Sequence, residues 1–351
     1  MAQKIPVGVL GATGAVGQRF IQLLECHPWF EVTALAASER SEGKRYAEAC
    51  HWLLSTPMPE SVRDMAVQET APGLDCRVIF ASLPGGIAGP TEKAFAEAGY
   101  FVCSNASAHR MDADVPLLVP EINAGHAALI DVQRCRRGWK GLIATSANCS
   151  VTAMILPLKP LNDAFGIHKL FAATMQAVSG AGYPGVPSLD ILGNVVPYIG
   201  GEEEKMESEP RKMLGVLRGE AIEHAPFVAS AQCNRVPVRD GHTVCLSIEF
   251  ARKPESAEAV VEVLENFKAA PEIAQLPSTP KHPIVVRREP DRPQPFRDLD
   301  LEGGMAAVVG RVRSCPLFDY KFVVLGHNTV RGAAGGSIHN AEMLVLQGYI
   351  A

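Results

Sequence analysis

The chain has 351 residues, 47% of them hydrophobic, and its 33 basic and 38 acidic side chains give a formal net charge of −5. A chain of this length can bury substantial cores, and two domains are the usual arrangement. The charges are spread along the sequence without a basic block, which argues against binding of duplex nucleic acid. No apolar run approaches the roughly 20 residues of a membrane-spanning helix, so no membrane partner is expected either.

Nine cysteines occur at irregular spacing and form no C-x-x-C pair. An odd number of cysteines in a chain of this length argues against a disulfide scaffold and favours a reducing compartment. The sequence enters an apolar strand pattern at residues 4–10, which leaves no room for a charged leader followed by an apolar segment. We therefore expect reduced thiols and a cytoplasmic protein.

Short apolar strands alternate with helical patterns over the first part of the chain. Strands are predicted at residues 5–10, 32–36, 78–81, 100–103 and 142–145, and helices at 15–25 and 91–98. This alternation is typical of a parallel α/β sheet. We therefore predict a Rossmann-like α/β domain over residues 1–148.

The pattern changes after residue 148, where longer β-prone segments favour a mixed or antiparallel sheet and an α+β domain over residues 149–327. Strands are predicted at residues 170–178, 243–250, 306–312 and 321–325, and helices at 256–268 and about 210–218. Many prolines at residues 272–300 predict an extended loop or arm. An amphipathic helix over 330–346 is expected to pack back on the first domain, which makes residues 328–351 a third unit.

A glycine-rich loop follows the first strand and opens the first helix, which is the context that gives such a motif weight. Its glycines permit a tight turn and close approach of the backbone to a pyrophosphate, which the helix N-terminus attracts. A glycine turn that merely joins strand to helix is the alternative. The residues expected to contact a dinucleotide here are Gly11, Thr13, Gly14, Ala15, Val16 and Gly17.

The end of the second strand bears on the choice between NAD and NADP. An NAD site normally has an acidic residue there, which binds the ribose 2′-hydroxyl. This chain instead has Ser38, with Arg40 and Ser41 close behind, and these residues suit a 2′-phosphate. We therefore expect NADP, although Glu39 argues the other way and leaves use of both cofactors open.

Cys149 is the one cysteine that the pattern places between a strand and a helix, where the sulfur lies at the positive helix end. A helix terminus contributes about 0.3–1 kcal/mol, whereas lowering a thiol pKa by one unit requires about 1.4 kcal/mol. A second activating group is therefore needed, and histidine is the usual one. His242 stands out because it follows a turn and comes seven residues after Arg235. A zinc site at His242 and Cys245 lacks further ligands at suitable spacing.

Six segments, in this order along the chain, resemble the archaeal and fungal-type branch of the aspartate-semialdehyde dehydrogenases. They are residues 11–17, 146–150, 176–182, 200–207, 234–242 and 328–335. The resemblance implies the fold of glyceraldehyde-3-phosphate dehydrogenase, with an NADP-binding domain and a catalytic and dimerisation domain. It also implies a reversible reaction in which aspartyl 4-phosphate and NADPH give aspartate semialdehyde, phosphate and NADP, at the branch to lysine, threonine and methionine.

The resemblance also implies roles for individual residues. Cys149 becomes the nucleophile, His242 the acid/base, and Gln176 orients the acyl intermediate. Arg235 and Glu202 bind the α-carboxylate and the ammonium group of the substrate. The phosphate is held by Asn105, Arg110 and Lys205, and Asn148, beside the nucleophile, is a further substrate-binding residue. Gly180 and Asn328 lie by the nicotinamide. Three-residue spacing places Glu202 and Lys205 on one helix face, whereas we expect solvated side chains at Glu203 and Glu204.

Other functions stay open on the sequence alone. A malonyl-CoA reductase would use the same cysteine and cofactor, but Glu202 would then have no ammonium group to bind. An acetylglutamyl-phosphate reductase and a noncatalytic NADP-binding sensor are more distant alternatives. The expected partners are small molecules and further copies of the chain, in a homodimer or a homotetramer.

Overall fold

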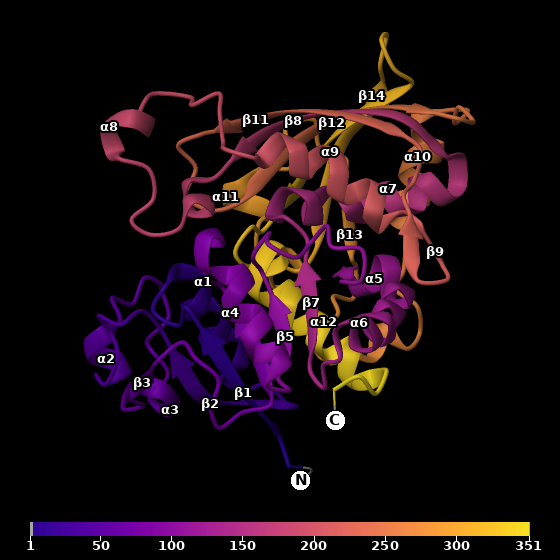
Figure 1. Cartoon of the computed structure of the whole chain (residues 1–351). Coiled ribbons are helices and arrows are strands. Elements are labelled where there is room, and N and C mark those ends of the chain that lie inside the picture. Colours follow the sequence, from indigo (N-terminus) through magenta and orange to yellow (C-terminus); the bar gives the residue numbers. More distant parts are fainter. Residues whose placement is uncertain (1–2, 351) are drawn as a thin grey trace.

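A computed structural model describes residues 3–350 and shows two large sheets joined by a long helix (Figure 1). The first sheet has seven strands in the order β3-β2-β1-β4-β5-β7-β6, all of them parallel. Its strands are β1 (Ile5–Leu10), β2 (Phe30–Ala36), β3 (Val67–Gln68), β4 (Val78–Ala81), β5 (Phe101–Ser104), β6 (Leu117–Leu118) and β7 (Leu142–Ser146). This is the Rossmann-like sheet that the sequence predicts.

Helices cover both faces of the parallel sheet and form a separate hydrophobic core on each face. One core contains side chains of α1 and α6, and the other contains side chains of α4. The helices of this part are α1 (Ala15–Leu24), α2 (Tyr46–Ala49), α3 (Glu60–Arg63), α4 (Gly85–Glu97), α5 (Pro120–Asn123) and α6 (Leu129–Arg137), with a 3-10 turn at Ala124–Ala128. Burial on both faces explains why these strands are almost continuously apolar.

The second sheet has six strands in the order β11-β8-β12-β15-β14-β13, with both parallel and antiparallel pairs, as predicted. Its strands are β8 (Ile167–Gln176), β11 (Val228–Arg235), β12 (His242–Phe250), β13 (Ile284–Arg287), β14 (Ala307–Ser314) and β15 (Tyr320–Gly326). The helices α7 (Cys149–Phe165), α9 (Glu202–Met213) and α10 (Ala257–Glu265) pack on one face of this sheet and share its hydrophobic core. Figure 1 shows them between the two sheets.

Two sequence-based assignments in this part are wrong. The helix expected at about 210–218 is α9, which ends at Met213, and β9 (Val216–Arg218) then pairs with β10 (Ala221–Glu223) in a hairpin. The proline-rich stretch 272–300 is not all loop, because β13 adds a strand to the sheet edge, followed by the short α11 (Pro295–Asp298). The prolines lie outside β13, which is a β-branched run that begins directly after Pro283, so none of them removes a hydrogen bond from the strand pairing.

The C-terminal segment returns to the parallel sheet, as predicted (Figure 1). It consists of one π-helical turn, Val330–Ala334, and α12 (Gly335–Leu346), which packs against β5 and β7. The prediction that this helix is amphipathic is wrong, since the helix is buried on nearly all sides. Within the described residues, no helix has the length and apolar content that crossing a bilayer requires.

A buried ion pair ties this C-terminal segment to the first domain. Arg331 is 2% exposed and donates two hydrogen bonds, of 2.8 and 2.6 Å, to the two carboxylate oxygens of Glu121 in α5. Burial favours the neutral carboxyl, but the opposing charge of Arg331 holds the pKa of Glu121 down at about 2. The Glu121 carboxylate is therefore ionised at neutral pH, and its buried negative charge is compensated by the guanidinium of Arg331.

Candidate active site

Three predicted site residues lie at the ends of adjacent strands of the mixed sheet. Gln176 ends β8 and Arg235 ends β11, and the two residues are paired in register across these parallel strands. His242 begins β12, whose direction is opposite to that of β8. The carboxyl ends of β8 and β11 and the start of β12 therefore lie side by side at the same end of the sheet. All three residues are buried, and Gly180 fits between Arg235 and His242, since a Cβ atom on it would lie 2.8 Å from Arg235 Nη1 and 3.0 Å from His242 Nε2.

Cys149 is the first residue of α7 and follows the end of β7 at Ser146 after two residues, so it lies between a strand and a helix as predicted. The side-chain oxygen of Asn148 caps the helix and accepts from the backbone N–H groups of Ser150 and Val151, at 2.9 and 3.2 Å. These two N–H groups are therefore not free to bind a substrate oxyanion. Behind Cys149 lies Gly332, where a Cβ atom would approach Cys149 Cβ to 2.7 Å.

Helix α9 brings charged side chains to Asn148. Glu202 accepts a hydrogen bond of 2.8 Å from the Asn148 side-chain amide, and the Lys205 ammonium lies 3.0 Å from the same Glu202 oxygen. The structure thus confirms that Glu202 and Lys205 share one helix face. Glu203 and Glu204 are exposed, as expected, although Glu203 also accepts from the backbone N–H of Cys233.

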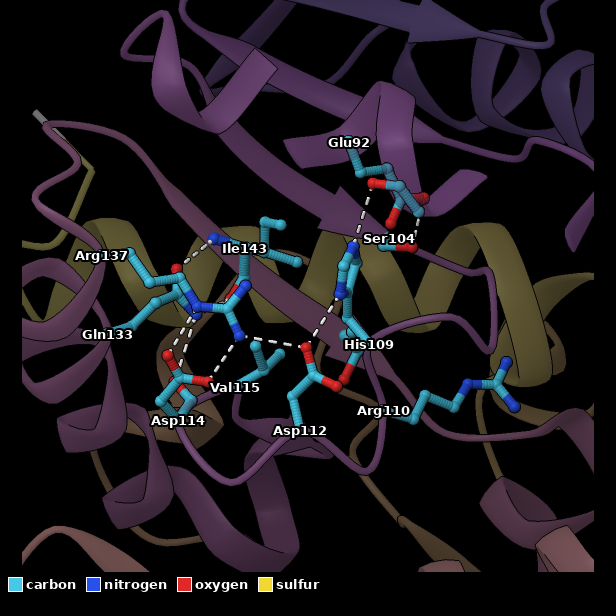
Figure 2. Close-up of polar contacts among 12 residues, drawn as sticks. Glu92, Ser104, His109, Arg110, Asp112, Asp114, Val115, Gln133, Arg137 and Ile143 are labelled. Carbon is cyan, nitrogen blue, oxygen red and sulfur yellow. Dashed lines mark hydrogen bonds and ion pairs between the residues drawn. The ribbon is translucent and has the colours of Figure 1, made fainter. Parts of the chain in front are cut away.

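The loop after β5 carries Asn105 and Arg110. Arg110 is 7% exposed, and its guanidinium donates to the Asn105 carbonyl at 2.7 Å. Figure 2 shows the far side of this loop, where Arg137 binds Asp112 and Asp114 and where the Arg110 side chain points away from that network. The ion pairs of Arg137 therefore hold the loop on one side. The guanidinium of Arg110 points away from them (Figure 2), toward Glu209 and the Asn105 carbonyl.

Several buried polar atoms around these residues have no partner within the protein, although buried polar groups nearly always have one. They are both side-chain amide atoms of Asn105 and of Gln176, Nε of Arg110, Nε2 of His242 and Oγ of Ser150. These residues come from the loop after β5, from the start of α7 and from the adjacent strand ends of β8 and β12. A polar ligand would supply the missing hydrogen bonds, so these atoms mark a binding site.

His242 is held in a single neutral form. Burial, followed by the positive charge of Arg235, lowers the pKa of His242 to about 3, so the imidazole is uncharged at neutral pH. Its Nδ1 accepts the backbone N–H of Ala177 at 3.1 Å, which places the ring proton on Nε2. The nitrogen without a partner is therefore a hydrogen-bond donor, suited to an oxyanion or a leaving group.

The thiol of Cys149 is protonated in this state. The residue is partly accessible, but its sulfur is closely surrounded by protein. Burial, followed by the negative charge of Glu202, raises the pKa of Cys149 to about 12, against the opposing charges of Arg110 and Arg235. Cys149 is therefore a neutral thiol in the ligand-free protein, although its sulfur lies at the start of a helix. A cationic group that neutralises Glu202 would lower the pKa of this thiol.

We predict that Glu202→Gln speeds alkylation of Cys149 by iodoacetamide several-fold at a given pH below 9. The substitution removes the negative charge that raises the thiol pKa, so a larger fraction of thiolate is present. The measurement is the alkylation rate at Cys149, followed by mass spectrometry across a pH series. Glu204→Gln, an exposed change on the same helix, is the control, and an unchanged or slower rate in Glu202→Gln would refute the prediction.

A cleft of about 640 Å³ lies at the carboxyl ends of β1, β2 and β4. Among the predicted cofactor residues, it is lined by Gly11, Thr13, Gly14, Ser38 and Arg40. Acidic Glu39 and Glu69 line it too. The shape of the loop fits a dinucleotide, because the loop turns back at Gly11 with a φ of 73° and then enters α1.

Gly17 lies in the first turn of α1, where a Cβ atom would come within 2.2 Å of the Gly11 carbonyl oxygen. It therefore allows the close packing of helix and loop that the motif requires. Val16 follows Ala15 in the same turn, while Ser41 is buried and its N–H bonds the Ser38 carbonyl at 2.8 Å. Neither Val16 nor Ser41 is among the residues that line the cleft.

A second cavity, of about 200 Å³, lies between the start of α1 and the mixed sheet and includes Ala15, Ser179 and Thr329 in its lining. Asn328, next to it, is 3% exposed. Its side chain accepts from the Gly241 N–H at 2.8 Å and donates to the Ser179 hydroxyl at 2.8 Å. Asn328 therefore joins the turn before His242 to the loop after β8.

Sequence reasoning missed two buried charged residues of α9 and the hydroxyl of Ser150. Glu209 is 1% exposed and Lys212 is 2% exposed, and both contact the first domain. A signal was available, because residues 202, 205, 209 and 212 repeat at the spacing of one helix face. The same spacing also describes a solvated face, so the sequence alone does not separate the two.

The structure thus has two domains, a dinucleotide-type sheet and a mixed sheet, which are joined through a cysteine-bearing helix. Two family models match the chain in this order: semialdehyde dehydrogenase, NAD binding domain, at residues 6–130, and semialdehyde dehydrogenase, dimerisation domain, at residues 158–331. Relatives that match over nearly the full length of the chain are named aspartate-semialdehyde dehydrogenase. The chain belongs to the aspartate-semialdehyde dehydrogenase family.

Archaeal and fungal members are among these relatives. The chain is 53% identical to the aspartate-semialdehyde dehydrogenase of Methanothermobacter thermautotrophicus, over 97% of this chain and 99% of that protein. It is 49% identical to that of Schizosaccharomyces pombe, over 97% of this chain and 98% of that protein. The crystal structure of the Candida albicans enzyme with NADP is similar at a TM-score of 0.91 and 45% identity, covering 99% of this chain and 100% of that one.

Proposed function

We propose that the protein is an NADP-dependent aspartate-semialdehyde dehydrogenase, which reversibly converts L-aspartyl 4-phosphate to L-aspartate 4-semialdehyde through a thioester on Cys149. The reaction serves the synthesis of lysine, threonine and methionine. The observation that carries the proposal is the set of unpartnered polar atoms around the N-terminus of α7, in a chain that matches the family over nearly its whole length. Neither a malonyl-CoA reductase nor a noncatalytic sensor finds support among these relatives.

In the proposed mechanism, Cys149 Sγ attacks the acyl carbon of the phosphorylated substrate. The carbon–sulfur bond forms, the bond to the phosphate oxygen breaks, and phosphate leaves with the thiol proton. NADPH supplies the hydride that reduces the resulting thioester. The carbon–sulfur bond then breaks and releases the aldehyde, and the sulfur takes up a new proton from solvent, because the original thiol proton has left with phosphate. The Nε2–H group of His242 donates to the oxygen that carries negative charge in each half-reaction, and Gln176 orients the acyl group.

Each charged group of the substrate is bound by a different charged residue of the site. Arg235 binds the α-carboxylate through its planar guanidinium, of which Nη1 is anchored on the Ala177 carbonyl at 2.8 Å. Glu202 binds the ammonium group, which also removes the charge that raises the pKa of Cys149. In this way the correct substrate activates its own nucleophile. Asn105, Arg110 and Lys205 form the phosphate subsite, supported by the unpartnered atoms of Asn105 and Arg110.

The proposed cofactor position follows the two cavities. Gly11, Thr13, Gly14 and the start of α1 would hold the pyrophosphate, and Ser38 with Arg40 would contact the 2′-phosphate, which suits NADP. The cavity at Ala15 lies on the way to the mixed sheet and would receive the nicotinamide half. Gly180 and Asn328 lie on that side, beside His242 and Ser179.

We also propose a homodimer or a homotetramer, and a cytoplasmic location. The match to the family's dimerisation domain at residues 158–331 supports self-association. So do exposed apolar side chains near α8 (Ser188–Ile191), where Leu189 is 92% exposed and Tyr198 is 74% exposed. The nine free cysteines support a reducing compartment.

The decisive assay is phosphate-dependent reduction of NADP with aspartate semialdehyde as substrate. We expect sustained NADPH formation only when aldehyde, phosphate and NADP are all present, since phosphate must release the acyl group from Cys149. Without phosphate, NADPH formation stops at about one equivalent per active site. Malonyl-CoA with NADPH is the comparison substrate. Absence of NADPH formation at saturating phosphate, with turnover of malonyl-CoA, would replace the proposed function with thioester reduction.

A further inference from the structure

We propose that Glu209 is a positioning residue that joins the phosphate subsite to the nucleophile, so that Arg110 and Cys149 are held in one geometry. The proposal rests on the proposed function, because it assigns phosphate to Arg110. Glu209 lies in the interior of α9, seven residues after Glu202 on the same helix face. It touches neither Cys149 nor any group assigned to the aspartyl part of the substrate.

The two oxygens of Glu209 serve different parts of the site. Oε1 accepts a hydrogen bond of 2.9 Å from Arg110 Nη1, and Oε2 accepts one of 2.7 Å from the backbone N–H of Asn148. Asn148 is the cap of α7 and directly precedes Cys149. One carboxylate of 1% exposure therefore connects the loop after β5 to the residue that presents the thiol.

An ordinary buried ion pair would be arranged differently. Arginine and carboxylate usually form two parallel hydrogen bonds, which use the fork of the guanidinium fully. Here Glu209 accepts from one nitrogen of Arg110 and the Asn105 carbonyl accepts from another at 2.7 Å, whereas Nε has no partner. The side-chain amide of Asn105 is also without a partner. The pair holds the guanidinium at its ends and leaves a donor available, as a phosphate subsite requires.

Lys212, one turn further along α9, strengthens this arrangement from the other side of the loop. Its ammonium donates to the backbone carbonyls of Arg110, Asp112 and Val115, at 2.7, 2.8 and 2.8 Å. The backbone of the loop is thus fixed to the same helix as the carboxylate of Glu209. Arg110 is held by its backbone through Lys212 and by its side chain through Glu209.

The test compares Glu209→Gln with the unmodified enzyme and with the exposed control Glu204→Gln. We expect the KM for phosphate to rise about 10-fold to 100-fold in Glu209→Gln, as for loss of a charge-assisted hydrogen bond, while the KM for aspartate semialdehyde changes less than about 2-fold. A merely structural role would lower the amount of folded enzyme without separating the two KM values. In Arg110→Lys, the added Glu209→Gln change should have little further effect on the phosphate KM.

A binding measurement keeps this inference separate from the proposed reaction. In a thermal-shift titration with inorganic phosphate, Glu209→Gln should require about 10-fold more phosphate for the same stabilisation, whether or not the enzyme turns over. If Glu209→Gln does not fold, Glu209→Asp retains the charge, is too short to reach both partners, and should show the same direction of change. An unchanged phosphate response in the folded variant would overturn the role of Glu209, whereas an enzyme without phosphate-dependent turnover would overturn only the proposed function.

Discussion

Cys149→Ser is expected to lower the rate of phosphate-dependent NADP reduction by on the order of 10⁴-fold or more, the scale seen when an enzyme loses its nucleophile. Serine preserves the size of the side chain and the helix start, but its alkoxide is far harder to form than a thiolate in a site that already opposes ionisation. Steady-state formation of NADPH from aspartate semialdehyde measures the loss.

The matched control for this variant is Cys245→Ser, a half-buried thiol in β12 that has no place in the mechanism. It should retain activity within about 3-fold, the usual range for a neutral change away from special features. Mass spectrometry should detect an acyl adduct on Cys149 when aldehyde and NADP are supplied without phosphate. Full activity in Cys149→Ser, or an adduct on another cysteine, would refute the mechanism.

Arg331→Met is expected to lower the free energy of unfolding by about 3–5 kcal/mol, the cost of leaving one partner of a buried ion pair uncompensated. Methionine fills similar space, so the effect reports the missing charge more than a cavity. Glu121 would remain buried with its pKa no longer held down by the guanidinium. Chemical denaturation of the purified variant, followed by circular dichroism, measures the loss.

The companion experiment adds Glu121→Gln to Arg331→Met. The double variant should recover part of the lost stability, because removal of both charges leaves no unpaired ion in the interior. Arg288→Met is the control, since Arg288 is exposed and its ion pairs with Glu258 and Glu265 lie at the surface. A double variant less stable than Arg331→Met would contradict this explanation of the pair.

The sequence predicted those features of the site that depend on local context. Cys149 could be placed because a strand, a capping residue and a helix follow one another within ten residues, and the loop at Gly11 is equally local. His242 and Arg235 came from their spacing and from the family resemblance, and the register of β8, β11 and β12 then explains how they meet.

Other features depended on tertiary packing. Glu209 and Lys212 have the composition and spacing of an exposed helix face, and only the loop packed above α9 buries them. The protonated thiol of Cys149 also escaped prediction, because local sequence shows the favourable helix end but not the burial and the nearby Glu202. The strand at Ile284–Arg287 was missed because prolines are frequent on both sides of it, although none lies within the strand.

The glycine that backs the nucleophile belongs to the last turns of the chain. Gly332 packs on Cys149 within a segment that the Arg331 ion pair fastens to α5. A polypeptide growing from its N-terminus makes the thiol long before it makes the wall behind it. The active site is consequently complete only after the C-terminal segment has been synthesised and has packed on the first domain. An incomplete or proteolysed chain would contain Cys149 without the residues that surround its side chain.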